Sequence, residues 1–265
     1  MPTYLLTIAF DGTRYAGWQR QADVPTVQQG VEEAVARVFG GRFHVEGSSR
    51  TDAGVHALGF AAHVRLPRAM DETVLAAALN GNLPQDITVR RVRRVPDGFH
   101  ARFQASGKRY VYRMIVGRER PPIARNYFHW VRKPVDLEAM REACRMLVGR
   151  HDFASFATNP GYERRHGTIR TIRHLHLIRR PRGIDLCIQG DGFLYNMVRA
   201  IAGTLIAVGT GNRPASWVAE ILAARDRRAA GATAPARGLY LVSVLYSKDV
   251  LVGVPSPPPA PPAGT

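Results

Sequence analysis

A stretch of small, turn-forming residues between two segments of β-type composition constrains how this chain can fold. It spans residues 47–59 (Gly-Ser-Ser-Arg-Thr-Asp-Ala-Gly-Val-His-Ala-Leu-Gly), with β-type residues at 43–46 and 60–66. Glycine adopts backbone angles that other residues resist, and Thr and Asp side chains readily bond nearby amides. The stretch therefore predicts a tight loop between two strands. On pattern alone it is an ordinary Asx-type turn, and it carries one arginine, Arg50, and one acid, Asp52.

The charge of the chain points to a polyanionic partner. Its 265 residues include 37 Lys and Arg against 21 Asp and Glu, which gives a formal net charge of +16. Nucleic acid is favoured over a membrane, because no basic amphipathic helix or lipidation motif accompanies the charge. All but three of the basic residues are Arg, the residue better suited to bidentate phosphate contacts and to stacking on bases. A biased genomic composition is the alternative explanation for this excess of Arg.

Other functional classes find no support in the sequence. The two cysteines, Cys144 and Cys187, lie far apart, and no paired-Cys or His-x-x-x-His spacing indicates zinc or another metal. No signal-peptide pattern is present at the N-terminus, and no apolar run reaches membrane-spanning length. We therefore expect no metal, no membrane association and a cytoplasmic location.

Hydrophobic periodicity predicts strands and helices in the same order in two halves of the chain. Strands are expected at 4–10, 87–95, 108–116, 169–178, 184–189 and in a last run ending near 246. Helices are expected at 27–39, 71–79, 136–147, 193–208 and 214–224, with an irregular connection at 117–134 and a mobile loop at 158–167. This order predicts an α+β fold with two similar subdomains, 1–117 and 118–250, whose antiparallel sheets join side by side around a basic cleft. Residues 251–265 are expected to form a disordered, Pro-rich tail.

Several segments resemble those of the TruA-type tRNA pseudouridine synthases. Residues 50–57, Arg-Thr-Asp-Ala-Gly-Val-His-Ala, are similar to the signature loop of that family, although the usual Gly before the Arg is Ser49 here. This departure matters only if the position needs a positive φ angle or a close approach of backbone to RNA. Further similar segments are Gly-Trp-Gln-Arg-Gln at 17–21, Phe-His-Ala-Arg-Phe at 99–103, Arg-Tyr-Val-Tyr at 109–112, Asn-Met-Val-Arg-Ala-Ile-Ala-Gly at 196–203 and Arg-Gly-Leu at 237–239. The resemblance covers about residues 4–246.

The resemblance implies the pseudouridine synthase fold and the isomerisation of uridine to pseudouridine at positions 38, 39 and 40 of the tRNA anticodon stem-loop. It also implies a homodimer that holds tRNA. The reaction breaks the bond from ribose C1′ to uracil N1 and joins C1′ to C5 without net electron transfer, so we expect no cofactor.

The family resemblance also assigns roles to individual residues. It makes Asp52 the catalytic nucleophile and pairs it with Arg199, which stands out as a cation inside an apolar helix. Tyr110 is expected to cover the target uracil, and Leu239 to contact it. Nearby cations favour an ionised carboxylate, so Arg50 and Arg199 would keep Asp52 charged. Because the target must be extruded from structured RNA, Arg50 is a candidate to fill the vacated space.

The loop after the first predicted strand places an aromatic ring among cations and amides. Its members Arg14, Trp18, Gln19 and Arg20 are candidates for RNA contact. Contact with a second subunit, or simple packing of Trp18 in the core, explains the same pattern equally well, and these interpretations stay open.

Two other classes of function compete with the enzyme. One is a non-catalytic tRNA-binding or folding protein on the same scaffold, although mere binding gains nothing from an acid that faces phosphates. The other is a hydrolase that uses Ser49, Asp52 and His56. The hydrolase lacks support, because the sequence contains no Gly-x-Ser-x-Gly motif between a predicted strand and a predicted helix.

Overall fold

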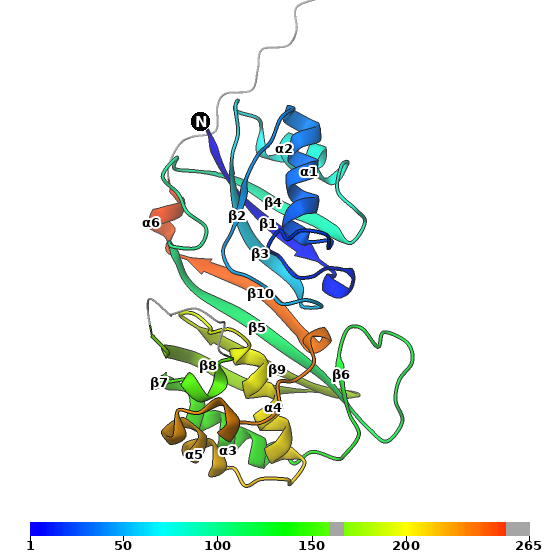
Figure 1. The fold of residues 1–265 in the computed structure, drawn as a ribbon, viewed down its shortest axis with the longest axis vertical. Coiled ribbons are helices and arrows are strands. Elements are labelled where there is room, and N and C mark those ends of the chain that lie inside the picture. Colours follow the sequence, from blue (N-terminus) through cyan, green and yellow to red (C-terminus); the bar gives the residue numbers. More distant parts are fainter. Residues whose placement is uncertain (159–166, 253–265) are drawn as a thin grey trace, which may run out of the picture. The chain divides into compact units, whose positions relative to one another are not determined.

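The computed structural model describes residues 1–158 and 167–252. The chain divides into two compact units, shown in Figure 1, which we describe separately: residues 1–106 with 243–252, and residues 107–242. The sequence placed a boundary at residue 117, whereas the contacts place it between residues 106 and 107, near the start of strand β5 (Ala105–Val116), and return the C-terminal segment to the first unit. The expected Pro-rich tail and most of the expected mobile loop lie outside the described residues.

The first unit is built on an antiparallel sheet with β1 at its centre. Strand β1 pairs on one side with β3 and on the other with β4, and β2 pairs with the outer side of β3. These strands are β1 (Thr3–Phe10), β2 (Val45–Gly47), β3 (His56–Arg65) and β4 (Ile87–Val95). Leu6 lies opposite both Ala62 and Val92, so the three strands present apolar side chains to the same face.

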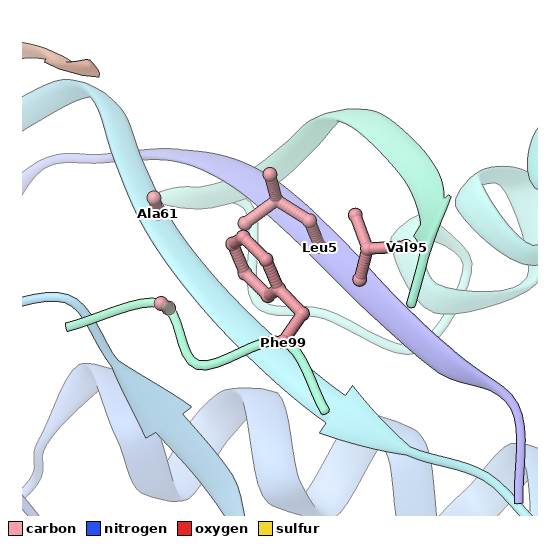
Figure 2. Close-up of a cluster of buried hydrophobic side chains, with 5 residues drawn as sticks. Leu5, Ala61, Val95 and Phe99 are labelled. Carbon is pink, nitrogen blue, oxygen red and sulfur yellow. The ribbon is translucent and has the colours of Figure 1, made fainter. Parts of the chain in front are cut away.

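Two helices pack on one face of this sheet. They are α1 (Val27–Phe39) and α2 (Glu72–Asn80), and each begins at a capping side chain, Thr26 and Asp71 respectively. The predicted apolar face of α1 is buried, and a Cβ on Gly30 would lie 3.1 Å from Ile87 Cδ1 of β4. The opposite face carries a separate cluster around Phe99, shown in Figure 2. A short helix, α6 (Lys248–Leu251), contributes Val250 and Leu251 to that cluster.

The second unit is built on mostly antiparallel strands, of which β5 and β10 run across the boundary between the units, at residues 106–107 and 242–243. Its strand order is β10-β5-β9-β8-β7, and the short β6 pairs in parallel with β5. These strands are β5 (Ala105–Val116), β6 (His129–Val131), β7 (Gly149–Asp152), β8 (Ile169–Arg180), β9 (Gly183–Gly190) and β10 (Leu239–Tyr246). Strand β6 lies within the connection at 117–134 that was expected to be irregular.

Three helices accompany these strands: α3 (Leu137–Leu147), α4 (Met197–Gly209) and α5 (Trp217–Ala224). In α3 the predicted apolar face is buried, and burial raises the pKa of the Cys144 thiol to about 12, which suits a core residue. Helix α4 begins four residues later than expected, because Asn196 adopts a left-handed backbone with φ 62°.

Mostly antiparallel strands with helices packed beside them confirm the expected α+β class. Within residues 1–158 and 167–252, no helix is both long enough and apolar enough to cross a membrane.

Candidate active site

The signature loop forms a tight connection between β2 and β3, as the sequence predicted. At its start the Ser48 N–H donates to the Ala61 carbonyl at 2.8 Å, and at its end the Val55 N–H donates to the Asp52 carbonyl at 3.2 Å. Gly54 takes φ 76°, a left-handed backbone that glycine adopts without strain. Asp52 is half-buried and Arg50 is exposed.

A second loop, residues 11–18 after β1, holds the signature loop in place through the backbone. The Trp18 N–H donates to the Thr51 carbonyl, and the Gly54 N–H donates to the Tyr15 carbonyl, both at 3.3 Å. Gly17 has φ 98°, and a Cβ there would lie 2.1 Å from the Thr51 oxygen. These contacts fix the backbone on both sides of Asp52 before any substrate arrives.

His56 adds a side-chain contact between the same two loops, which sequence reasoning did not anticipate. The ring is 2% exposed, and its Nδ1 accepts from the Gly12 N–H at 3.1 Å and lies 3.1 Å from an Asp11 carboxylate oxygen. A Cβ on Gly12 would lie 2.0 Å from the Val55 carbonyl oxygen. The Asp-Gly pair that ends the first strand was the available signal.

Trp18 is buried in the core, which favours the packing interpretation that the sequence left open beside RNA contact. Its side chain is 1% exposed and stacks on Phe60 with ring centroids 4.0 Å apart. A Cβ on Gly47 would lie 2.4 Å from the indole Nε1. A buried ring has no exposed face on which a base could stack. Trp18 instead packs between Phe60 and Gly47, and so supports the start of the signature loop.

The other three RNA-binding candidates bond to their own unit. Arg14 donates through Nε and Nη2 to Asp86, at 3.0 and 2.6 Å. Gln19 Nε2 donates to the Gln28 side chain at 2.9 Å. Arg20 donates to Glu32 at 3.0 Å, and about half of its side chain stays exposed.

Ser49 does not take a left-handed backbone. The described non-glycine residues with positive φ are Asp23, Ala124, Asn196 and Arg225. Serine in place of the family glycine therefore costs no backbone strain at this position.

In the second unit, Tyr110 and Tyr112 lie on the same face of β5. Tyr110 is opposite Ile188 in β9, is 7% exposed and meets the Phe193 ring edge-on at 5.2 Å. Tyr112 is fully buried and donates its hydroxyl to the Pro235 carbonyl at 2.9 Å. Burial raises the pKa of the Tyr112 hydroxyl well above its ordinary value, so it stays a donor.

Tyr112 also supports the turn that delivers Leu239 to the start of β10. That turn is a 3-10 helix, Ala236–Gly238, and a Cβ on Gly238 would lie 2.8 Å from Tyr112 Cζ. Leu239 is 6% exposed.

Arg199 lies in the first turns of α4, where two contacts orient its guanidinium. Its Nε donates to the Ala234 carbonyl at 2.8 Å, and its Nη1 donates to the Asn196 side chain at 2.9 Å. The segment containing Ala234 runs against the helix, because a Cβ on Gly203 would lie 1.8 Å from the Ala232 carbonyl oxygen. Three residues of the motif at 196–203 thus act together. Asn196 bonds the Arg199 guanidinium, and Gly203 lets the segment that also bonds Arg199 approach the helix.

The structure places Arg50 and Asp52 together on one loop of the first unit. Tyr110, Arg199 and Leu239 belong to the second unit. The pairing of Asp52 with Arg199 and with Tyr110 therefore stays a prediction.

Comparison with known proteins shows that the sequence of this chain matches one protein family. Residues 6–104 and 143–247 match the family model described as tRNA pseudouridine synthase. The chain is 43% identical over 247 residues to tRNA pseudouridine synthase A of Syntrophotalea carbinolica, which covers 93% of this chain and 97% of the relative. It is 41% identical over 241 residues to tRNA pseudouridine synthase A 2 of Clostridium perfringens, covering 91% and 98%. It is 42% identical over 268 residues to tRNA pseudouridine synthase A of Myxococcus xanthus, an alignment that covers 100% of this chain and 97% of the relative.

Proposed function

Because this chain belongs to the tRNA pseudouridine synthase family, we propose that it isomerises uridine to pseudouridine at positions 38, 39 and 40 of the tRNA anticodon stem-loop. The observation that carries the proposal is the backbone clamp on the signature loop, which holds Asp52 half-exposed on a rigid support. A nucleophile gains rate from being fixed in the geometry of attack before the substrate binds.

In this proposal Asp52 is the nucleophile. The C1′–N1 bond breaks, the base rotates, and a C1′–C5 bond forms; the proton lost from C5 balances the proton gained at N1. Attack of the carboxylate at C1′ or at C6 fits the same loop. Arg199 supplies the cationic partner of Asp52, since its Nε and Nη1 are already oriented by Ala234 and Asn196.

Tyr110 and Leu239 would form the walls around the uracil. The edge contact with Phe193 fixes the Tyr110 ring, and the Ala236–Gly238 turn fixes the start of β10. A planar ring and a branched aliphatic side chain suit the two sides of a flipped base. Arg50, exposed beside Asp52, would occupy the space that the base vacates.

The enzyme is further proposed to act as a homodimer in the cytoplasm, where both subunits hold the tRNA. The net charge of +16 supports a large contribution of phosphate contacts to affinity. No cofactor enters the proposal, because the reaction rearranges bonds without net electron transfer.

The test incubates the purified chain with unmodified tRNA transcript and maps pseudouridine at each uridine by mass spectrometry after carbodiimide derivatisation, because pseudouridine and uridine have the same mass. Wild-type protein should convert positions 38, 39 and 40, whereas Asp52→Asn should bind the same tRNA with similar affinity and form no product. Wild-type protein that binds tRNA without converting any uridine would instead establish the non-catalytic binding protein. Substantial turnover by Asp52→Asn would refute the nucleophile.

A further inference from the structure

The turn that follows β4 exposes an aromatic ring beside a cation. Phe103 is 75% exposed, although Phe99 and Ala101 of the same turn are fully buried. The exposed Arg102 lies with its Cζ 5.8 Å from the Phe103 ring centroid. A large exposed apolar side chain next to a guanidinium is typical of a binding surface rather than of a core.

Hydrogen bonds hold this turn in one conformation. The ring Nδ1 of His100 accepts from the N–H groups of Arg102 and Phe103, at 3.2 and 3.4 Å. The His100 N–H donates to the Gln104 side chain at 2.8 Å. The Ala101 N–H donates to His63 Nδ1 of β3 at 3.2 Å, which ties the turn to the sheet. Phe103 is therefore presented on a rigid support, which lowers the entropic cost of binding.

Two further arginines lie on the sheet face that the turn covers. Leu5, which packs with Phe99 (Figure 2), is paired with His63 in β3 and with Arg93 in β4. Residues directly opposite in neighbouring strands share a face, so Arg93 lies on the side of the turn. Arg91 follows on the same face, because it is paired with Thr7, two residues along β1 from Leu5.

We propose that Arg102 and Phe103 form a stacking platform for one unpaired base of the RNA substrate, with Arg91 and Arg93 binding phosphates beside it. The proposal rests on the proposed function and adds a second contact point on the RNA. Stacking on an aromatic ring beside Arg is a common way to hold an unpaired base, because every base offers a π face.

The platform would bind a nucleotide other than the one that reacts. Its anchor, His63, lies seven positions along β3 from His56, which borders the Asp52 loop. At the rise of a β-strand this separation is about 23 Å.

A second copy of this chain is the competing occupant, and the charge argues against it. A twofold interface sets the same patch against itself, so it would bring these arginines close to their own symmetry copies. RNA phosphates neutralise them instead.

The first experiment compares Phe103→Ala with Val74→Ala in tRNA modification. Val74 is the matched control, because it is 55% exposed in the same unit but lies in helix α2. Phe103→Ala should raise KM for tRNA roughly fivefold to a hundredfold, the range for losing one base–aromatic stack, with the effect in KM rather than kcat. Phe103→Trp should restore KM. An unchanged KM for Phe103→Ala, or the same rise for Val74→Ala, would overturn the platform.

The second experiment measures binding in the Asp52→Asn background, so that it does not depend on turnover. Adding Phe103→Ala should raise the Kd for unmodified tRNA by the same factor, and adding Arg91→Gln should lessen the salt dependence of log Kd by about one phosphate contact. If wild-type protein makes no pseudouridine while these Kd changes appear, the proposed function fails and the platform stands. Sedimentation gives the remaining outcome: a dimer that Phe103→Ala converts to monomer would identify a subunit interface and overturn the platform.

Discussion

The backbone N–H of Trp18 donates to the carbonyl oxygen of Thr51 at 3.3 Å, one residue before Asp52. The candidate nucleophile is therefore positioned by a segment more than thirty residues earlier in the chain. This contact requires Gly17, whose φ of 98° and close approach to the Thr51 oxygen leave no room for a side chain.

Gly17→Ala should displace the signature loop and lower kcat by at least about tenfold, because small misplacements of a nucleophile are costly. Gly41→Ala is the matched control: Gly41 has φ 87°, but nothing lies within 4 Å of its Cβ position. Both variants carry the strain of a left-handed alanine, about 1–2 kcal/mol in the free energy of unfolding. Single-turnover rates and urea melts on both proteins make the comparison. Equal losses of activity would show that the clamp does not position Asp52.

Trp18→Leu should destabilise the fold by about 2–4 kcal/mol, because it removes a ring buried against Phe60 and leaves a cavity. The Kd for tRNA of the folded protein should stay within about twofold, since the indole has no exposed face. Urea denaturation and filter binding at a temperature where the variant is folded give the two numbers. A large loss of tRNA affinity without loss of stability would restore the RNA-contact interpretation.

Sequence reasoning predicted the elements of this fold well where local signals were strong. Helix α1 begins at the predicted cap Thr26, and most of its valines form the expected buried face, with only Val38 half-buried. Helix α4 shows the limit: apolar residues continue upstream to Phe193, but the left-handed Asn196 delays the first helical turn. The left-handed Asn196 at the start of this helix donates a side-chain hydrogen bond to Thr158, 38 residues away in sequence. Hydrophobic periodicity cannot reveal a contact of this kind.

For the candidate site, too, the sequence predicted the features that depend on local signals and missed those that depend on distant contacts. The loop around Asp52 followed from small residues between two β-type runs, because turn chemistry is local. The roles of His56, Gly12 and Trp18 did not follow, since each depends on two loops that meet only in the folded chain. A tryptophan among cations and amides has the same local pattern whether it binds RNA or fills a core. Burial decides between the two, and here it decides for the core.

Arg199→Lys should lower kcat by about a hundredfold or more. Arg199 uses two different nitrogens to bond Ala234 and Asn196, and a lysine ammonium cannot reproduce that fork. Losing charged hydrogen bonds should also lower the free energy of unfolding by about 1–3 kcal/mol. Arg213→Lys serves as control, because Arg213 is exposed and contacts the Trp217 ring in the same unit. An unchanged rate for Arg199→Lys would remove Arg199 from the proposed pairing with Asp52.

The stability of the fold should fall in mild acid because of His63. Burial, and then the charge of neighbouring His100, lower the pKa of His63 from 6.5 to about 4. The folded state therefore binds fewer protons than the unfolded state between these values. Above pH 6.5 the contribution of His63 to the free energy of unfolding is complete, and it is lost as the pH falls toward 4. At pH 5 the loss amounts to about 2 kcal/mol.

Urea denaturation of wild type and His63→Asn at pH 7.5 and pH 5 isolates this contribution, because the other titrating groups cancel in the difference. Asparagine is the chosen replacement, since its side-chain oxygen can accept from the Ala101 N–H as Nδ1 does. The pH dependence of wild type should exceed that of His63→Asn by about 2 kcal/mol, whereas the exposed His176→Asn should behave like wild type. Parallel curves for wild type and His63→Asn would mean that His63 is protonated in the folded state at pH 5, and that the turn it anchors is open to water.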